Sequence, residues 1–282
     1  MKQTILLTGA TGFIARNLRH QLQEKHNVSA PTRAELNLLN VEAVEAYLRD
    51  HRFDVVIHAA NTNNVVHPEH AAQMLDFNLR MFYNLERCSQ LYGKLYYFGS
   101  GAEYDLRHYV PRMTEEYFGK HIPADPYGFS KYIMSKAAKG NIYDLRLFGV
   151  FGPHEEWRRR FISNMIYQAL SYDVMRMDRN MYFDYLYVND LAKILEWFLH
   201  HDPRYHHYNV CTGEEIDLLS LARIVREETG SSAEIMMNGT EWKLPYTGSN
   251  ARLLGEIGDF QFTPIRTAVR EMVVWYRENG FS

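Results

Sequence analysis

The sequence predicts an α/β fold built on a parallel sheet, and three observations carry that prediction. Short apolar runs rich in β-branched residues, such as residues 53–60, recur along the chain. Segments whose apolar residues recur at helical spacing separate these runs, and strands that alternate with helices form parallel sheets of βαβ units. A glycine-rich turn follows the first apolar run, at the end of a strand, where such sheets bind ligands.

The individual elements are expected in a regular order. Strands are expected at 5–8, 28–33, 53–60, 94–98, 143–148, 174–177 and 182–188. Helices are expected from the glycine-rich turn to residue 22, at 41–50 and 71–91, from residue 127 onward, and at 161–170, 191–200 and 267–278. The alternation of strands and helices becomes less regular beyond residue 152, which indicates a second unit.

The glycine-rich turn has the features of a dinucleotide site. Gly9 permits a tight turn, Gly12 lets backbone amides approach a pyrophosphate, and the small Ala15 lets the helix pack closely on the strand. Phosphates would then lie at the positive end of the helix. Thr32 and Arg33 stand at the end of the second strand, where NAD-binding proteins place a carboxylate, so NADP(H) is favoured and NAD(H) is the alternative.

We therefore predict a Rossmann doubly wound parallel sheet with a smaller C-terminal substrate-binding cap. The NADP-binding Rossmann domain is expected to span residues 1–152 together with returning segments around 181–210. The cap is expected to comprise residues 153–180 and 211–282. A chain of 282 residues is long enough to bury a core of this size.

The composition excludes several classes of function. A formal net charge of −3 leaves no basic excess for a nucleic-acid backbone, and no apolar run is long enough to cross a bilayer. The two cysteines, Cys88 and Cys211, and a strand that begins within the first residues predict a cytoplasmic chain without disulfides or a signal peptide. The 13 histidines lack carboxylate or thiolate support at ligand spacing, so no metal site is expected.

Three later residues predict acid–base chemistry. Tyr127 and Lys131 are spaced i, i+4 at the start of a helix, so their side chains project from the same face. An ammonium group beside a phenol favours the phenolate, so Lys131 is expected to lower the pKa of Tyr127 and let it act as an acid or base. Ser100 lies at the end of a neighbouring strand, where it is expected to hydrogen-bond the same substrate oxygen.

With these residues in place, nearly the whole chain resembles the extended short-chain dehydrogenase/reductase family, the group that acts on nucleotide-activated sugars. The motifs that carry the resemblance are Thr8–Ala15, His58–Ala60, Asn78, Ser100 four residues before Tyr104, Tyr127 with Lys131, Arg146–Pro153, Asp184–Asp190 and Tyr208–Gly213. The resemblance implies hydride transfer between a nicotinamide and a sugar carbon, with Tyr127 as proton donor or acceptor. It also implies that Lys131 holds the nicotinamide ribose and that Ser100 positions the reacting oxygen.

Binding residues are expected on the same basis. The cofactor is expected to contact Gly9, Thr11, Gly12, Phe13, Ile14, Arg33, Asn37, Leu38, Ala59, Ala60, Asn78, Tyr127, Lys131 and Phe148. The substrate, a small-molecule nucleotide sugar, is expected to contact Ser100, Gly101, Ala102, Tyr127, Gly149 and Arg179.

The residues after Ser100 discriminate between reactions. Sugar 4,6-dehydratases, which resemble this family, carry an Asp-Glu pair directly after the serine or threonine. This chain has Gly101 and Ala102 at those positions, and neither residue can transfer a proton. Glu103 comes one residue later and is expected to point to the other side of a strand. Dehydration is therefore not expected.

Residues 32–40 resemble the fucose-synthase-like and dTDP-4-dehydrorhamnose-reductase-like branch of the family. Fucose synthases epimerise the keto-sugar with a cysteine and a histidine before they reduce it. Here Ala102 stands at the cysteine position, and His154 is the candidate counterpart of the histidine. NADPH-dependent reduction of a nucleotide-linked 4-keto-6-deoxy sugar at C4 is therefore favoured. A nucleotide-sugar 4-epimerase that holds NAD tightly is the alternative, and a non-catalytic NADP-binding sensor is a third hypothesis.

The chain departs from the family pattern at several positions. Gly149 replaces an asparagine and Phe183 replaces an arginine, so other cations are needed for the substrate phosphates. The candidates are Arg158, Arg159, Arg160, Arg176 and Arg179. The helix that begins near Tyr127 is also short, which leaves open whether the chain forms the homodimer that this helix commonly supports.

Overall fold

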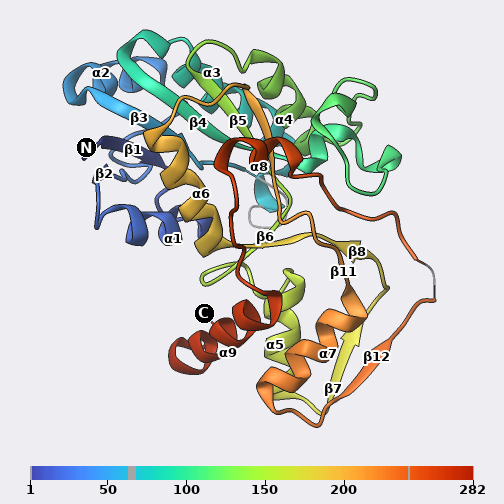
Figure 1. The fold of residues 1–282 in the computed structure, drawn as a ribbon. Coiled ribbons are helices and arrows are strands. Elements are labelled where there is room, and N and C mark those ends of the chain that lie inside the picture. Colours follow the sequence, from blue (N-terminus) through green and yellow to red (C-terminus); the bar gives the residue numbers. More distant parts are fainter. Residues whose placement is uncertain (1, 63–67, 241, 282) are drawn as a thin grey trace.

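A six-stranded parallel sheet forms the centre of the protein (Figure 1). The structure is a computed structural model that describes residues 2–62, 68–240 and 242–281. The strand order is β10-β5-β4-β3-β1-β2, and every neighbouring pair is parallel. The strands are β1 (Thr4–Thr8), β2 (Asn27–Ser29), β3 (Phe53–His58), β4 (Tyr92–Ser100), β5 (Ile142–Leu147) and β10 (His207–Val210).

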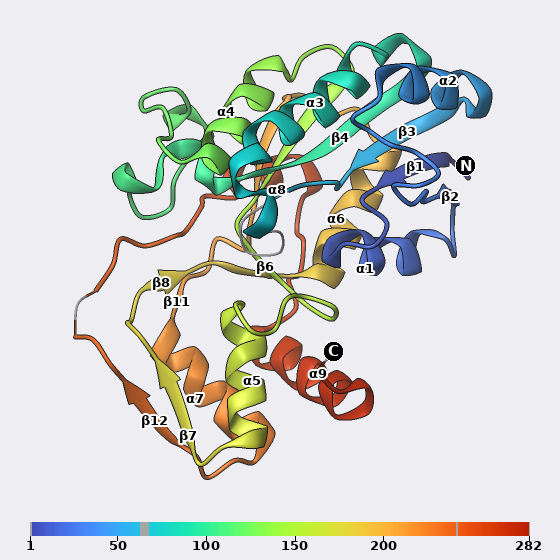
Figure 2. The ribbon, with the colours of Figure 1, turned by 180° about the vertical axis from the view of Figure 1, so that it is seen from behind.

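Helices cover both faces of this sheet because consecutive residues of a buried strand point to opposite sides (Figures 1 and 2). Ile5 and Leu7 pack on the face covered by α1 (Phe13–Leu22) and α6 (Val188–His200), whereas Leu6 packs on the other face. That second face is covered by α2 (Val41–His51), α3 (Met74–Glu86) and α4 (Pro126–Ala137). The predicted Rossmann doubly wound α/β fold is confirmed.

A second apolar core lies below the carboxyl edge of the sheet in the view of Figure 1. It is formed by a group that we call the C-terminal lobe: α5 (Phe161–Ser171), α7 (Leu218–Thr229), α9 (Ile265–Asn279) and the parallel pair β7 (Val174–Met177) and β12 (Glu234–Met237). Ile166, Leu221 and Met272 are fully buried in this core. The division of the chain into two domains at the residues given above stays a prediction.

Two short strand pairs join the lobe to the sheet. The pair β6 (Gly149–Phe151) and β9 (Tyr185–Tyr187) is parallel, and the pair β8 (Tyr182–Phe183) and β11 (Ile216–Asp217) is antiparallel. The remaining helix, α8 (Ala251–Ile257), returns to the sheet, where Leu253 joins the core of the α1 face. Among the described residues, no helix has the length and apolar character that crossing a bilayer requires.

Several predicted elements have different bounds, and three of them show the difference most clearly. The strand expected at 28–33 ends at Ser29, because Pro31 has no N–H and the N–H of Thr32 donates to Glu35 in a turn (2.7 Å). The helix expected at 71–91 is confined to α3 and is flanked by 3₁₀ turns at Pro68–Gln73 and Ser89–Leu91. The strand expected at 182–188 is interrupted at Asp184 and ends where α6 begins.

Candidate active site

The turn between β1 and α1 brings the backbone of two strands close together. Gly9 has φ = 75°, and a Cβ at this position would lie 2.7 Å from the backbone nitrogen of Ala60 after β3. Only glycine satisfies both the positive φ and this close approach. The N–H of Gly12 donates to the carbonyl of Gly9 (2.8 Å), so α1 begins directly at Phe13 with its first amides directed toward the turn.

A cleft of about 240 Å³ opens at this turn. It is lined by most of the predicted cofactor residues, namely Gly9, Thr11, Gly12, Arg33, Asn37, Leu38, Ala59 and Ala60. Phe13 and Ile14 begin α1 beside it and pack against the two apolar cores. The cleft also contains residues that were not predicted, including Thr62, Phe77 and Met81. Phe77 and Met81 flank the predicted Asn78 one helical turn apart on α3, a spacing that marks a face directed at the cleft.

Asn78 acts on the cleft through the backbone of Thr62. Its side-chain oxygen accepts from the N–H of Thr62 (2.8 Å), and its amide nitrogen donates to the Thr62 carbonyl (2.9 Å). Both groups are buried, so the pairing fixes the segment that follows β3. Asn78 therefore shapes the cleft, and its predicted contact with the cofactor stays a prediction.

The charges at the end of β2 suit a phosphate. Arg33 is exposed along the cleft, whereas the nearby Glu35 accepts hydrogen bonds from the N–H and the hydroxyl of Thr32 at 2.7 and 2.8 Å. These bonds lower the pKa of Glu35, and its carboxylate is engaged in the turn. The exposed Arg33, the first amides of α1 and the cleft beside the turn together fit a dinucleotide that carries a 2′-phosphate.

Ser100 ends β4 and begins a tight 3₁₀ turn at Gly101–Tyr104. Its hydroxyl oxygen accepts from the N–H of Ala102 (3.2 Å), and the carboxylate of Glu103 accepts from the N–H of Ser100 (2.9 Å). This reciprocal pair is a capping box, which fixes the backbone on both sides of the serine. The hydroxyl of Ser100 is thereby held at the carboxyl edge of the sheet.

Tyr127 and Lys131 lie one turn apart on α4, as predicted. The helix begins after Asp125, whose carboxylate accepts from the N–H of Gly128 (2.8 Å), and Pro126 occupies its first position. A Cβ at Gly128 would lie 2.7 Å from the carbonyl oxygen of Ala102, so the start of α4 lies against the turn that follows Ser100, and the structure brings all three predicted catalytic residues to one place. The ammonium of Lys131 donates to the carbonyl of Phe98 (2.8 Å) and lies 5.9 Å from the centre of the Tyr127 ring.

The pKa of Tyr127 is not lowered as predicted. Burial raises the pKa of Tyr127 above its ordinary value, although the hydrogen bond from Ser100 and the charge of Arg160 oppose the shift. The prediction was wrong because burial, which disfavours the phenolate, is the largest influence on the pKa of Tyr127. Burial also lowers the pKa of Lys131 to about 8, against the attraction of Glu103 and Asp144. Tyr127 is therefore a protonated phenol at neutral pH.

A buried ionic group lies beneath Ser100. Arg146 donates to Glu103 (2.7 Å) and Asp144 (3.1 Å), and its other nitrogens donate to Tyr104 and Ser135. Glu103 was expected to be turned away by a strand; the structure turns it away through the 3₁₀ turn. Burial and the charge of Asp144 raise the pKa of Glu103, while Arg146 opposes this shift. A fully buried carboxylate with these partners is unavailable for dehydration.

Aromatic residues face Ser100 from the opposite side. Phe148, predicted at the cofactor, is buried in a cluster with Tyr109 and Tyr246. Gly149 begins β6, where a Cβ would lie 2.6 Å from the carbonyl oxygen of Asp184. A larger residue such as asparagine would therefore need this strand pair to separate. Ala102 is buried behind the turn.

The predicted cation Arg179 lies exposed between β7 and β8. A different arginine acts electrostatically on the site, because the charge of Arg160 opposes the rise that burial causes in the pKa of both Tyr127 and Tyr246. Arg160 immediately precedes α5, so a residue named among the alternatives in the sequence carries this interaction. His154 packs edge-on against Trp275 of α9 at 5.0 Å, and its role as the counterpart of the epimerising histidine stays a prediction.

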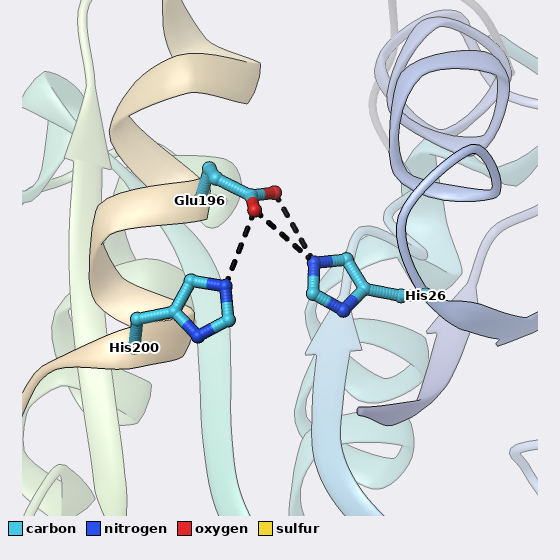
Figure 3. A group of neighbouring side chains, drawn as sticks. All are labelled: His26, Glu196 and His200. Carbon is cyan, nitrogen blue, oxygen red and sulfur yellow. Dashed lines mark hydrogen bonds and ion pairs between the residues drawn. The ribbon is translucent and has the colours of Figure 1, made fainter. Parts of the chain in front are cut away.

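The structure also assembles a histidine cluster that sequence spacing did not indicate (Figure 3). Atoms of His26, Glu196 and His200 lie within 4.8 Å of one another, a geometry that suits a metal ion. However, Nδ1 of His26 accepts from the N–H of Gln3 (3.2 Å), which places the ring proton on Nε2, facing Glu196 at 3.2 Å. The cluster is thus a hydrogen-bonded bridge between the β2 side of the sheet and α6.

Comparisons with known proteins agree with this geometry. The dTDP-4-dehydro-6-deoxy-D-allose reductase of Streptomyces sp is 26% identical over 98% of this chain and 96% of its own length. The GDP-L-fucose synthase of Escherichia coli (strain K12) is 23% identical over 99% of this chain and 98% of its own length. The crystal structure of a GDP-L-fucose synthetase from Naegleria fowleri bound to NADP matches with a TM-score of 0.85 and 20% identity, covering 98% of this chain and 93% of that chain.

The model of the NAD dependent epimerase/dehydratase family matches residues 5–211, which include the β1–α1 turn, Ser100, Tyr127 and Lys131. The chain therefore belongs to the NAD dependent epimerase/dehydratase family.

Proposed function

We propose that the chain is an NADPH-dependent reductase of a nucleotide-linked 4-keto-6-deoxy sugar that acts at C4, with Tyr127 as the proton donor. The observation that carries the proposal is the arrangement of Ser100, Tyr127 and Lys131, in which the start of α4 lies against the turn after Ser100 and Lys131 is bonded to the strand that ends at Ser100. Reduction of a ketone puts negative charge on its oxygen, and a protonated phenol is suited to neutralise that charge.

The cleft at the β1–α1 turn is the proposed cofactor site. When bound there, NADPH supplies the hydride. The first amides of α1 bind its pyrophosphate, and Arg33 binds the 2′-phosphate. The NADP in the Naegleria structure and the reductase named in Streptomyces support this choice of cofactor and reaction.

Each catalytic residue has a separate role in the proposed reduction. Ser100 donates a hydrogen bond to the ketone oxygen, and Tyr127 transfers its proton to the same oxygen. Lys131 is held by its bond to the Phe98 carbonyl and binds the nicotinamide ribose. The carboxylate of Glu103 takes no part in proton transfer, because Arg146 and the N–H of Ser100 already occupy it.

The sugar nucleotide is proposed to bind between the carboxyl edge of the sheet and the lobe. The aromatic cluster of Phe148, Tyr109 and Tyr246 forms one wall beside Ser100. Gly101 and Gly149 keep the adjoining backbone without side chains. Arg160 supplies positive charge on the lobe side, with the exposed Arg179 as the other proposed cation.

The proposed function is tested by following NADPH oxidation with a panel of GDP-, dTDP-, CDP- and UDP-linked 4-keto-6-deoxy sugars. We expect one nucleotide class to be reduced, with a new hydroxyl at C4 identified by NMR, and NADPH to be used in preference to NADH. Retention of NAD through dialysis, together with interconversion of C4 epimers without net NADPH consumption, would identify a 4-epimerase and contradict the proposal.

A further inference from the structure

The phenol of Tyr246 lies beside Ser100 and against Gly101, the next residue. Its hydroxyl oxygen is 3.4 Å from the hydroxyl oxygen of Ser100. Tyr246 is separated from Ser100 by 146 positions in the sequence and belongs to the segment that precedes α8. Neither the motifs nor the expected binding residues included it.

The position of this phenol is fixed from two directions. The N–H of Tyr246 donates to the carbonyl of Tyr182 (2.8 Å), and its carbonyl accepts from the N–H of Asp184 (3.2 Å), so the backbone is paired along β8. The ring stacks on Tyr109 with centroids 5.2 Å apart and lies tilted against Phe148 at 5.3 Å. Such aromatic contacts define where the hydroxyl points.

The neighbouring backbone is shaped to admit this hydroxyl. A Cβ at Gly101 would lie 2.8 Å from the hydroxyl oxygen of Tyr246 and 2.7 Å from that of Tyr109. Gly101 has no need of a positive φ, so the close approach of the two phenols is the constraint that its side chain would violate. The glycine after Ser100 therefore serves the contact with Tyr246.

The hydrogen-bonding capacity of Ser100 gives this contact a direction. A serine hydroxyl has one hydrogen and two acceptor positions. The N–H of Ala102 occupies one acceptor position (3.2 Å), and Tyr246 fills the second when it acts as the donor. The Ser100 hydrogen is then left for a third partner, such as the oxygen of a bound substrate.

We propose that Tyr246 is a positioning residue that donates to the Ser100 hydroxyl and thereby directs the Ser100 hydrogen at the ketone oxygen of the substrate. This inference rests on the proposed function, because it assigns the ketone oxygen as the target. Burial raises the pKa of Tyr246 well above its ordinary value, so the phenol remains a donor throughout the neutral range. Tyr246 thus acts on the reaction through Ser100.

The test is a double-mutant cycle on the full chain with Tyr246→Phe, Ser100→Ala and the combined variant. Tyr246→Phe removes the hydroxyl and keeps the ring packing. We expect it to lower the single-turnover rate of hydride transfer about tenfold, the size of one hydrogen bond, and to leave the KM for NADPH unchanged. In the Ser100→Ala background the same substitution should have no further effect, because the group through which it acts is gone.

Tyr182→Phe is the matched control, since it removes a phenol from the same strand pair at an exposed position. It should react at the rate of the unchanged chain. Equal rates for Tyr246→Phe and the unchanged chain, or effects of Tyr246→Phe and Ser100→Ala that multiply, would overturn the inference.

The unchanged chain and the three variants of the cycle also separate this inference from the proposed function. If no keto-sugar is reduced by the unchanged chain, the proposed function fails, and the cycle is then read from thermal unfolding. Shifts in Tm that are not additive for Ser100→Ala and Tyr246→Phe support the hydrogen bond between them, and additive shifts overturn it.

Discussion

The two sides of Ser100 are built from opposite kinds of chemistry. On the sheet side, Glu103, Asp144 and Arg146 form a buried ionic group whose members are almost completely inaccessible to solvent. On the lobe side, Tyr246 and its aromatic neighbours form a neutral wall. Charges in a buried site require fixed partners, whereas aromatic rings can be fixed by shape alone. The ionic side therefore determines the backbone of the turn, and the aromatic side determines the direction of the hydroxyl.

The largest effect is expected where the two sides meet, at Tyr127. Tyr127→Phe should lower keto-sugar reduction by about 10³-fold or more, because it removes the proton donor, and should change NADPH affinity by no more than a few-fold. Turnover is measured by NADPH oxidation and affinity by fluorescence titration. Tyr132→Phe on the same helix is the control and should retain activity. Undiminished turnover in Tyr127→Phe would remove Tyr127 from its proposed role.

The ionic side can be broken at Arg146. Arg146→Met leaves two buried carboxylates without their cation, so it should lower the free energy of unfolding by about 3–5 kcal/mol, as measured in urea. The control is Arg266→Met, which removes a half-exposed arginine from its pairs with Glu227 and Glu228 and should cost less than about 1 kcal/mol. A similar loss in the free energy of unfolding for the two variants would show that the buried ion pairs of Arg146 contribute no more to stability than the half-exposed pairs of Arg266.

Glu155 is a buried acid that lies beside the lobe, where Ser163 of α5 donates to it. Its titration shows whether a buried carboxylate is tolerated there. Burial raises the pKa of Glu155 to about 7, against the hydrogen bond from Ser163 and the charge of Arg160. The folded state thus binds a proton that the unfolded state releases, so this contribution to stability is present below about pH 4.5 and is lost as the pH rises through 7.

Glu155→Gln should remove this loss and raise the free energy of unfolding at pH 8 by about 3 kcal/mol relative to the unchanged chain. Urea unfolding between pH 5 and about pH 8 measures the difference. Glu156→Gln, at the next position, should keep the pH dependence of the unchanged chain. An unaltered pH dependence in Glu155→Gln would mean that the carboxyl is ionised in the fold at neutral pH.

The smallest effect is expected at Arg33, a charge that is exposed and so matters only through a ligand. Arg33→Ala should raise the KM for NADPH about tenfold by loss of a charged hydrogen bond to the 2′-phosphate. The KM for NADH, which lacks that phosphate, should not change and serves as the internal control. Parallel increases for both cofactors would assign Arg33 to general binding and remove it as the basis of the preference.

The cofactor half of the site was predictable because its signals are local in the sequence. Gly9, Gly12 and Ala15 lie within one turn and its helix, and Tyr127 and Lys131 lie within one helical turn. Elements and motifs of this kind depend on spacing, which the sequence displays directly. The parallel sheet follows from the same pattern of βαβ units, whereas the order of its strands was not predicted.

The aromatic wall and the electrostatics could not be predicted in this way. Tyr246 reaches Ser100 from 146 positions away through a backbone pairing with β8, and no spacing rule indicates such a contact. The predicted direction of the Tyr127 pKa shift was wrong because burial in the tertiary structure, which spacing does not display, raises the pKa. The group of His26, Glu196 and His200 was missed for the same reason, since two distant segments build it.

The backbone pairing of Tyr246 ties two parts of the molecule together. Tyr246 is paired with β8, which pairs in turn with β11 at the start of α7, so one side of the residue is joined to the lobe. Its ring packs on Tyr109 and Phe148, and the residues that follow it pair with Met113, so the other side is joined to the segments that follow β4 and β5. A relative movement of lobe and sheet would therefore strain the contact between the phenol and Ser100, and the approach of these two hydroxyls reports whether the lobe is in place.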